Sequence, residues 1–277
     1  MATGNRDTSI HVVKKGEVVI SFESLNKPEA TSPVTAFISK HGDTIRDIAF
    51  GVDDVELIYD NAVRRGAVPI SAPRVVEDEH GYVKLASLHA FEDVVHTLVE
   101  RKHYKGRFLP GFKPHYLQEP LNPLFPSVQL LKIDHVGIPV PVKKMKPICS
   151  NYFKTLDFHH FWSVDEKVMA SKESALRTTV ISDFDEKVKM PVFEPAPGQK
   201  VSQIQEFLEH NGGGGAQHVA VLTEDIIKTV STLRVACNDS ETRRAVLASA
   251  GSVLQDPEGK DGPVQVPHQR RPRAAAG

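Results

Sequence analysis

Two histidines at matched positions of an internal repeat are the residues whose type and spacing most clearly indicate a chemical role. Residues 46–55, RDIAFGVDDV, align without gaps with residues 217–226, QHVAVLTEDI, and residues 134–138, DHVGI, form a weaker third copy. The second residue of these copies is Asp47, His218 and His135, respectively. Neutral imidazole nitrogens are ligands that suit iron, zinc and copper. Because equivalent positions of paired modules face each other across one sheet, His135 and His218 are predicted to share a metal ion.

A structural role is the competing interpretation of any single histidine. The chain contains 13 histidines, a number that suggests metal or acid–base chemistry without establishing it. A strand followed by an acidic residue and a helix is also a common arrangement, so two unrelated starts are the alternative to a repeat. Only His135 and His218 have a positional reason to bind metal.

The repeat requires a strand and then a helix in each copy. Asp53 and Asp54 are N-cap candidates for a helix that Gly66 ends. A proline-rich linker over residues 106–126 separates two halves. The other expected elements are strands at residues 11–13, 18–22, 45–52, 83–91, 94–99, 130–140, 160–164, 175–182 and 188–194, a helix at 143–156, a segment of uncertain type at 203–209 and a glycine loop at 211–215.

Bulk composition excludes several classes of protein. At about 150 residues per domain, a chain of 277 residues allows one large domain or two ordinary ones. A net charge of -1 argues against nucleic acid as a partner. No apolar run approaches the roughly 20 residues of a membrane helix, and no secretory signal is visible. Two cysteines cannot build a disulfide framework, which indicates a reducing, cytoplasmic location.

Long motifs in both halves resemble the 4-hydroxyphenylpyruvate dioxygenase family. In the second half these are IDHVGIPVP, LDFHHFWSVD, KMPVFEPAPGQKVSQIQEF and NGGGGAQHVAVLTEDI. In the first half they are HGDTIRDIAFGVDD, RRGA, HTLVE and GRFLPGF. The resemblance runs from about Thr8 to Arg234 and is specific, because the motifs are long.

The resemblance implies an α+β, vicinal-oxygen-chelate fold, in which βαβββ modules form curved mixed sheets. It also implies one Fe(II), for which His135 and His218 match the family's two histidine ligands. The implied reaction consumes 4-hydroxyphenylpyruvate and O2 in tyrosine and phenylalanine catabolism. Oxidative decarboxylation and ring hydroxylation with side-chain migration then yield homogentisate. Related enzymes pair through their first halves, so a homodimer is a further expectation.

Four further residues of this chain match positions of the family's substrate pocket. Gln203 and Gln217 match glutamines near the substrate ring, and Thr178 stands where a serine is usual. Phe193 stands where an asparagine is usual, which removes a hydrogen-bonding group and changes the pocket's shape. Hydroxymandelate synthase, which shares the fold, the metal and the keto acid, is therefore the alternative within the family. An extradiol-type dioxygenase on the same fold has no support from the two glutamines.

The family's third metal ligand, a glutamate on the last strand of the last module, has no counterpart in the sequence. Glu194, Glu206 and Glu224 are the nearest carboxylates, and nothing in their positions brings them to a metal. The expected organisation is a non-catalytic half at residues 1–122 with its first module incomplete, a catalytic half at 130–234 with its last module incomplete, and a disordered tail at 235–277. The chain is thus expected to be truncated at both ends. A catalytically inactive fragment or pairing subunit is the alternative function.

Overall fold

The computed structural model describes residues 1–4, 7–27, 32–114, 127–164, 175–196 and 201–238. The chain divides into two compact units, of which the first comprises Met1–Gln118 and Val128–Thr229. The described residues of the second unit are Ser127 and residues 230–238. Among the described residues, no helix has the length and apolar character needed to cross a membrane.

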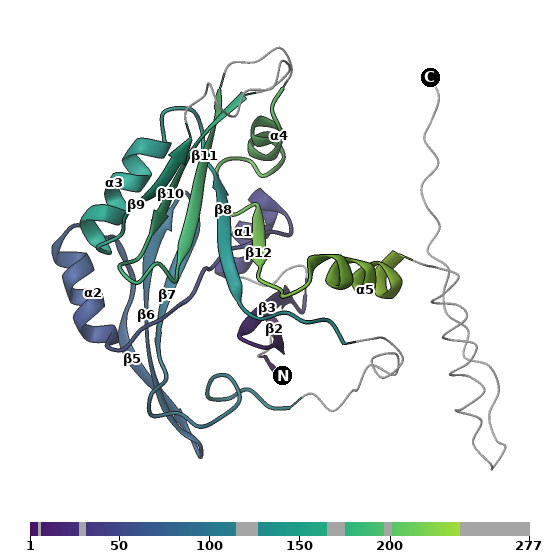
Figure 1. Ribbon diagram of the computed structural model, residues 1–277. Coiled ribbons are helices and arrows are strands. Elements are labelled where there is room, and N and C mark those ends of the chain that lie inside the picture. Colours follow the sequence, from purple (N-terminus) through teal and green to yellow (C-terminus); the bar gives the residue numbers. More distant parts are fainter. Residues whose placement is uncertain (5–6, 28–31, 115–126, 165–174, 197–200, 239–277) are drawn as a thin grey trace. The chain divides into compact units, whose positions relative to one another are not determined.

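A first module of one strand, one helix and three strands occupies residues 50–100 (Figure 1). Its elements are β4 (Phe50–Gly51), α2 (Val55–Arg64), β5 (Pro69–Asp78), β6 (Gly81–Phe91) and β7 (Val94–Glu100). The strands form a sheet in the order β4-β7-β6-β5, with β4 parallel to β7 and the other pairs antiparallel. Helix α2 packs on β5, β6 and β7.

A second module repeats this topology. Its elements are β8 (Ile133–Pro139), α3 (Met145–Thr155), β9 (His159–Val164), β10 (Ala175–Ser182) and β11 (Lys189–Ala196). The strand order is β8-β11-β10-β9, again with the first strand parallel to the last. Strand β12 (His218–Val221) pairs antiparallel with β8, and α5 (Ile226–Asn238) follows it as the start of a third strand–helix copy. The expected α+β fold of βαβββ modules is confirmed.

The strand pairings match the two modules residue by residue. Asp47 pairs with Val95 in the first module, and His135 pairs with Lys189 in the second. Val95 and Lys189 stand at the same spacing before Glu100 and Glu194, the glutamates near the ends of β7 and β11. Asp47 and His135 therefore occupy the same place in their modules, as the sequence repeat predicts.

These two glutamates also fix the helices of their modules. The Glu100 carboxylate accepts a hydrogen bond from the backbone N–H of Val55, the first residue of α2, at 3.1 Å. The Glu194 carboxylate accepts from the backbone N–H groups of Lys143 and Met145, at 3.0 and 3.4 Å, where α3 begins. The first N–H groups of a helix have no partner inside it. A carboxylate at this end therefore satisfies backbone donors and complements the helix dipole.

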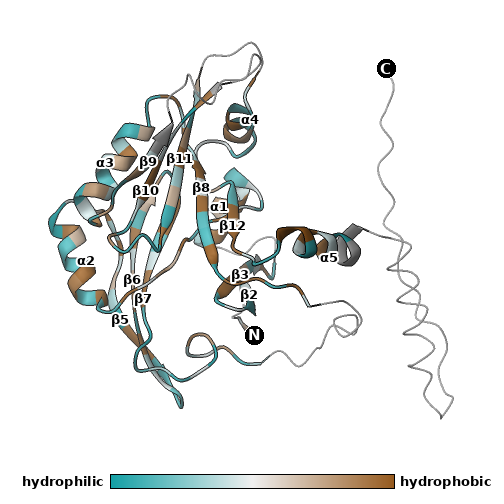
Figure 2. Cartoon of the chain, viewed as in Figure 1, coloured by the Kyte–Doolittle hydropathy of each residue, from teal (hydrophilic) through white to brown (hydrophobic). Residues whose placement is uncertain are grey.

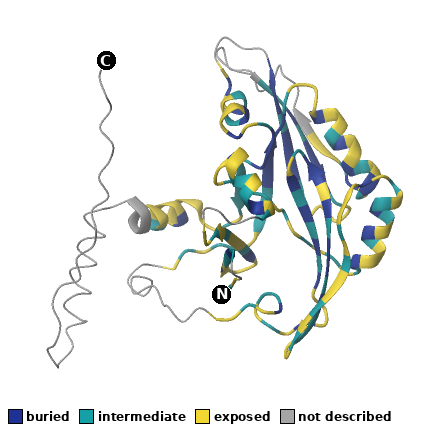
Figure 3. Cartoon of the chain, turned by 180° about the vertical axis from the view of Figure 1, so that it is seen from behind, coloured by how far each residue is buried: buried dark blue, intermediate teal, exposed yellow. Residues whose placement is uncertain are grey.

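Apolar residues of the strands and the inner faces of α2 and α3 form the core. One buried cluster joins Ile138, Met190 and Val192 of the second module to Phe91 and Val94 of the first. Figure 3 shows buried residues along the strands and exposed residues on the outer faces of α2 and α3. The hydropathy colouring of Figure 2 places hydrophilic residues on those same outer faces. The helices thus cover the sheets with one face each, as amphipathic helices do.

A three-stranded sheet and two helices are the remaining elements of the first unit among the described residues. Strands β1 (Ala2–Gly4), β2 (Thr8–Lys15) and β3 (Val18–Leu25) form an antiparallel sheet, in which β2 and β3 contain the strands expected at residues 11–13 and 18–22. Helix α1 (Pro33–His41) begins at the N-cap Ser32 and was not predicted. Helix α4 (Gln203–His210), capped by Ser202, resolves the segment of uncertain type.

Two sequence expectations differ from the structure. The strand expected over residues 45–52 is reduced to Phe50–Gly51, and Ile45 and Asp47 form isolated bridges to Ala216 and Val95. Helix α5 continues past Arg234 to Asn238, inside the segment expected to be a tail. The remainder of that expected tail, residues 239–277, lies outside the described residues.

Candidate functional site

The structure brings the two repeat histidines together. His135 lies in β8 and His218 opens β12, the strand beside it. In the pairing register His218 faces Gly137, and Ala220 faces His135, so the two imidazoles are diagonal neighbours. Their ring centroids lie 5.6 Å apart, with the ring planes at 86°.

The position of the His218 ring depends on Gly137. A Cβ atom at position 137 would lie 2.1 Å from Cε1 and 2.5 Å from Nε2 of His218. Those distances are far below a van der Waals contact, so the imidazole occupies the space that any side chain there would need. Glycine at this point in the strand reflects a close approach between backbone and ring.

Each histidine has an oxygen acceptor at Nδ1 from the residue that precedes it. His135 Nδ1 lies 2.8 Å from Asp134 Oδ2, and His218 Nδ1 lies 3.2 Å from Gln217 Oε1. Carboxylate and amide oxygens only accept, so both Nδ1 atoms are the donors. Neither Nε2 atom forms a hydrogen bond with any residue that the structure describes.

The electrostatic environment keeps a lone pair available on the second histidine. Burial lowers the pKa of His218, and the neighbouring His135 ring lowers it further. The hydrogen bond with His135 lowers the pKa of the Asp134 carboxyl. At neutral pH His218 is therefore a neutral imidazole with a proton on Nδ1, and its Nε2 atom can act as a ligand.

Phe193 and Thr178 lie on the same face of the sheet as the histidines. Phe193 pairs with Thr178 on β10 and with Pro139 on β8, and paired residues of neighbouring strands project to one side. The centroid of the Phe193 ring is 6.0 Å from that of His218. Thr178 is 3% exposed, and its Oγ1 is a buried atom without a hydrogen-bond partner among the described residues. An unpartnered buried hydroxyl is uncommon in folded proteins and is consistent with a ligand nearby.

Gln203 is placed differently from Gln217. It is the first residue of α4 and is exposed, and no described contact links it to the histidines. Helix α4 itself packs against β8 and β11. The structure thus brings Gln217, Phe193 and Thr178 near the histidine pair, whereas a role for Gln203 stays a prediction.

None of the three glutamates nearest in sequence joins the pair. Glu194 is committed to the start of α3 and to Arg177, whose guanidinium lies 3.1 Å from its carboxylate. Glu206 lies on α4 and Glu224 follows β12, and both side chains are exposed. Within the described ranges, no group of three or more His, Cys, Asp and Glu side chains could hold a metal ion. Among the described residues, only the two imidazole nitrogens of His135 and His218 are thus brought together as potential donors.

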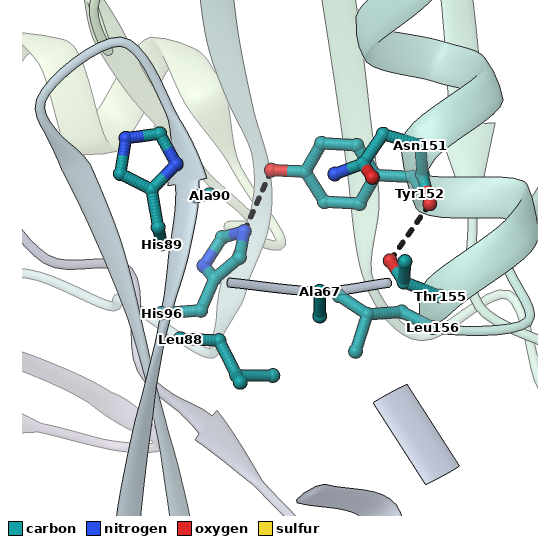
Figure 4. Close-up of a pocket in the computed structure, with 9 residues that line it drawn as sticks. All are labelled: Ala67, Leu88, His89, Ala90, His96, Asn151, Tyr152, Thr155 and Leu156. Atoms are coloured by element: carbon teal, nitrogen blue, oxygen red, sulfur yellow. Dashed lines mark hydrogen bonds between the residues drawn. The ribbon is translucent and has the colours of Figure 1, made fainter. Parts of the chain in front are cut away.

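A second histidine environment lies at a small cavity between β6, β7 and α3 (Figure 4). There His96 Nδ1 lies 2.8 Å from the Ile48 carbonyl oxygen, and its Nε2 lies 2.6 Å from the Tyr152 hydroxyl. Burial lowers the pKa of His96 to about 4. Both ring nitrogens are engaged, so this histidine binds its neighbours rather than a metal.

Comparisons with curated proteins match most of the chain. A 4-hydroxyphenylpyruvate dioxygenase of Tetrahymena thermophila is 41% identical over 237 residues, which are 84% of this chain and 59% of that protein. The enzyme of the same name from Dictyostelium discoideum is 41% identical over 242 residues, which are 84% of this chain and 64% of that protein. No family model matches the chain.

The chain is a homologue of the 4-hydroxyphenylpyruvate dioxygenases. It spans about three fifths of the length of these curated dioxygenases. Among solved structures, a mutant of 4-hydroxymandelate synthase from Streptomyces coelicolor superposes with a TM-score of 0.67 at 28% identity, over 83% of this chain and 64% of that one. A fusion protein that contains a 4-hydroxyphenylpyruvate dioxygenase part has a TM-score of 0.58 at 17% identity, over 85% of this chain and 34% of that one. The fold is thus the vicinal-oxygen-chelate fold that the dioxygenase resemblance implies.

Two residues near the histidines were missed in the sequence. Asp134 and Gly137 both belong to a motif that carries the dioxygenase resemblance, but only His135 stands out there by its chemistry. The available signal for Asp134 is the parallel between Asp134-His135 and Gln217-His218, since each pair places an acceptor before the histidine. No sequence signal indicates that Gly137 lies under the His218 ring, because that contact depends on the register of β12 against β8.

Proposed function

We propose that the chain binds Fe(II) through His135 and His218 and converts 4-hydroxyphenylpyruvate and O2 to homogentisate and CO2. The observation that carries this proposal is the pair of adjacent imidazoles, each with Nδ1 occupied and Nε2 open. Two nitrogen donors at this separation fit the histidine part of a two-histidine, one-carboxylate iron site. Iron, when bound, would chelate the keto acid and activate O2.

The described residues would shape the pocket around the substrate. The Oε1 atom of Gln217 accepts from His218, so its amide N–H groups remain to donate to a substrate oxygen. The Thr178 hydroxyl offers a further polar group without a described partner. Phe193 presents an aromatic ring beside His218, which favours contact with the substrate ring and excludes water from that side. Gln203 is included in the proposal on the basis of the resemblance alone.

Location and assembly are part of the same proposal. We infer a cytoplasmic enzyme, supported by the buried thiol of Cys149, which is free. A homodimer through the first half of the chain follows from the resemblance. The division into a non-catalytic half at residues 1–122 and a catalytic half at 130–234 likewise rests on the resemblance and on the module repeat.

The test combines metal binding with turnover. Protein purified without metal and reloaded with Fe(II) under argon would be mixed with 4-hydroxyphenylpyruvate and air-saturated buffer. We expect substrate-dependent O2 uptake with homogentisate formed in equal amount, and loss of both in His135→Ala and His218→Ala. Product would be identified by liquid chromatography against homogentisate and hydroxymandelate standards.

Each contrary outcome identifies a different error. Hydroxymandelate as the product would replace the proposed reaction and would trace to Phe193. Iron bound through both histidines without substrate-dependent O2 uptake would overturn the enzymatic activity and favour an inactive pairing subunit. Iron binding that persists in both alanine variants would overturn the metal site itself.

A further inference from the structure

The residues that precede the two histidines make equivalent contacts in different modules. Asp134 Oδ2 lies 2.8 Å from Nδ1 of His135, and Gln217 Oε1 lies 3.2 Å from Nδ1 of His218. These residues occupy matching positions of the repeat, and the N-terminal copy, residues 46–55, has Arg46 there, before Asp47. A hydrogen-bond acceptor therefore precedes each of the two histidines, whereas a cation, Arg46, precedes the aspartate at the equivalent position.

An acceptor at Nδ1 decides which nitrogen of an imidazole can bind a metal. A neutral imidazole carries one proton, and an oxygen acceptor at Nδ1 holds it there. The lone pair is then on Nε2, and the hydrogen bond also fixes the rotation of the ring and raises its basicity as a ligand. Without that acceptor either tautomer forms, and only the Nδ1–H tautomer has a lone pair on Nε2 that can bind a metal.

We propose that Asp134 and Gln217 are positioning residues that hold His135 and His218 in the Nδ1–H tautomer and direct both Nε2 atoms to one metal ion. This inference rests on the proposed function, because it assigns the orientation of the ligands of the same site. It goes beyond that function by giving Asp134 a role and by giving Gln217 a role toward the protein in addition to its proposed contact with substrate.

The two positioning residues differ in charge, and the consequence is measurable. The contact to Asp134 is the shorter and is charge-assisted, whereas the contact to Gln217 is between neutral groups. Loss of Asp134 should therefore weaken metal binding more than loss of Gln217. Because one lone pair of its Oε1 atom is engaged by His218, Gln217 keeps both amide N–H groups to donate, and an acceptor atom of the substrate is the partner that we expect for them.

The first experiment reads the tautomers in the protein without metal. Histidine labelled with ¹⁵N in the full chain gives separate long-range ¹H–¹⁵N correlations for the two ring nitrogens. In the neutral form of each ring, identified by a pH series, we expect unprotonated shifts at Nε2 for both His135 and His218. In Asp134→Leu and Gln217→Leu, the adjacent histidine should show the averaged shifts of two exchanging tautomers. A conservative change, Asp134→Asn, keeps an acceptor oxygen and should restore the Nε2 pattern.

The second experiment measures affinity for Co(II), a stable probe ion for this ligand set, by its visible absorption. Outer partners of histidine ligands change metal affinity by about 10- to 100-fold. We expect a loss in this range in Asp134→Leu, a smaller loss in Asp134→Asn and in Gln217→Leu, and no loss in Gln217→Glu. Asp185→Leu removes an exposed carboxylate that pairs with Lys187 and serves as the matched control. Circular dichroism would verify that each variant is folded.

The outcomes separate this inference from the function on which it rests. Protons on Nε2 rather than Nδ1 in the native chain would overturn the inference, whether or not metal binds. Native affinity for Co(II) in a folded Asp134→Leu variant would also overturn it. Failure of the native chain to bind Co(II), with both tautomers as proposed, would instead refute the metal site of the proposed function.

Discussion

The imidazole of His218 takes up the space beside Gly137 that a side chain would require. The three atoms nearest to a methyl group at position 137 would all belong to the imidazole of His218, at the end of a side chain that can rotate. We therefore expect Gly137→Ala to displace the ring and lower affinity for Co(II) by about tenfold or more, by analogy with other perturbations of ligand orientation. The free energy of unfolding, measured in urea, should fall by only about 1 kcal/mol, as is typical of a tolerated change in a strand.

A matched control for this variant exists in the first module. Gly51 lies in β4, and a Cβ atom there would meet nothing within 4 Å. Gly51→Ala should leave Co(II) affinity and stability nearly unchanged. If Gly137→Ala bound Co(II) as tightly as the native chain does, the position of the His218 ring beside Gly137 would not be required for metal binding.

Single residues show where sequence reasoning succeeds and where it stops. The pairing of His135 with His218 could be predicted because a repeat places equivalent residues on neighbouring strands. The contact between Gly137 and His218 could not, because it joins residues far apart in the chain through one particular register. The exposure of Gln203 could not be predicted either. A glutamine that follows an N-cap serine has the same neighbours in the sequence whether it lies on the buried or on the exposed face of the helix.

At the scale of elements, Glu194 connects the last strand of its module to its helix. Its side chain is 8% exposed and accepts from two backbone N–H groups at the start of α3 and from Arg177. We expect Glu194→Gln to lower the free energy of unfolding by about 2 kcal/mol, the range for a buried hydrogen bond to a charged group. Equilibrium unfolding in urea, followed by circular dichroism, measures the change.

Glu206→Gln provides the comparison for Glu194→Gln, because Glu206 is exposed on α4. That variant should change the free energy of unfolding by less than about 0.5 kcal/mol. If Glu194→Gln proved equally mild, the carboxylate would not be what fixes α3. In that case α3 would begin without a stabilising side-chain cap, because its N-cap residue, Lys144, forms no side-chain cap hydrogen bond.

Elements with strong periodicity were predicted well, and elements with weak local signals were not. Helix α2 was evident because Asp54 caps it and its apolar residues keep helical spacing. Strand β5 was missed because it begins at Pro69 and contains Pro73, although prolines are tolerated at the edge of a sheet, which is where β5 lies. Helix α1 was missed because its N-cap Ser32 precedes a proline and a short apolar run that resemble a loop.

At the scale of the whole first unit, His96 joins the two modules and makes their stability depend on pH. It lies in β7 of the first module, and its Nε2 accepts from the Tyr152 hydroxyl on α3 of the second. Because burial lowers the pKa of His96 to about 4 from the ordinary 6.5, the unfolded chain binds a proton that the folded chain does not. Stability from this group is therefore complete above pH 6.5 and is lost as the pH falls toward 4.

The size of the loss follows from the shift. A difference between 6.5 and about 4 corresponds to about 3 kcal/mol, most of it lost across that interval. We expect His96→Gln to be less stable at pH 7 but to show a flatter dependence of unfolding free energy on pH between 6.5 and 4. Leu57→Met, at an exposed position of α2, changes no titratable group and should keep the native slope. The same slope in His96→Gln and in the native chain would show that other groups govern acid unfolding.

Tyr152→Phe tests whether this contact couples the modules. The variant keeps the aromatic packing of Tyr152 but leaves Nε2 of His96 as a buried acceptor without its donor. An unpaired buried acceptor costs about 1–3 kcal/mol. We expect that loss at pH 7, together with a single unfolding transition in calorimetry, because both modules contribute to one buried cluster. Two separate transitions in Tyr152→Phe would mean that the His96–Tyr152 hydrogen bond, rather than the shared apolar cluster, makes the modules unfold together.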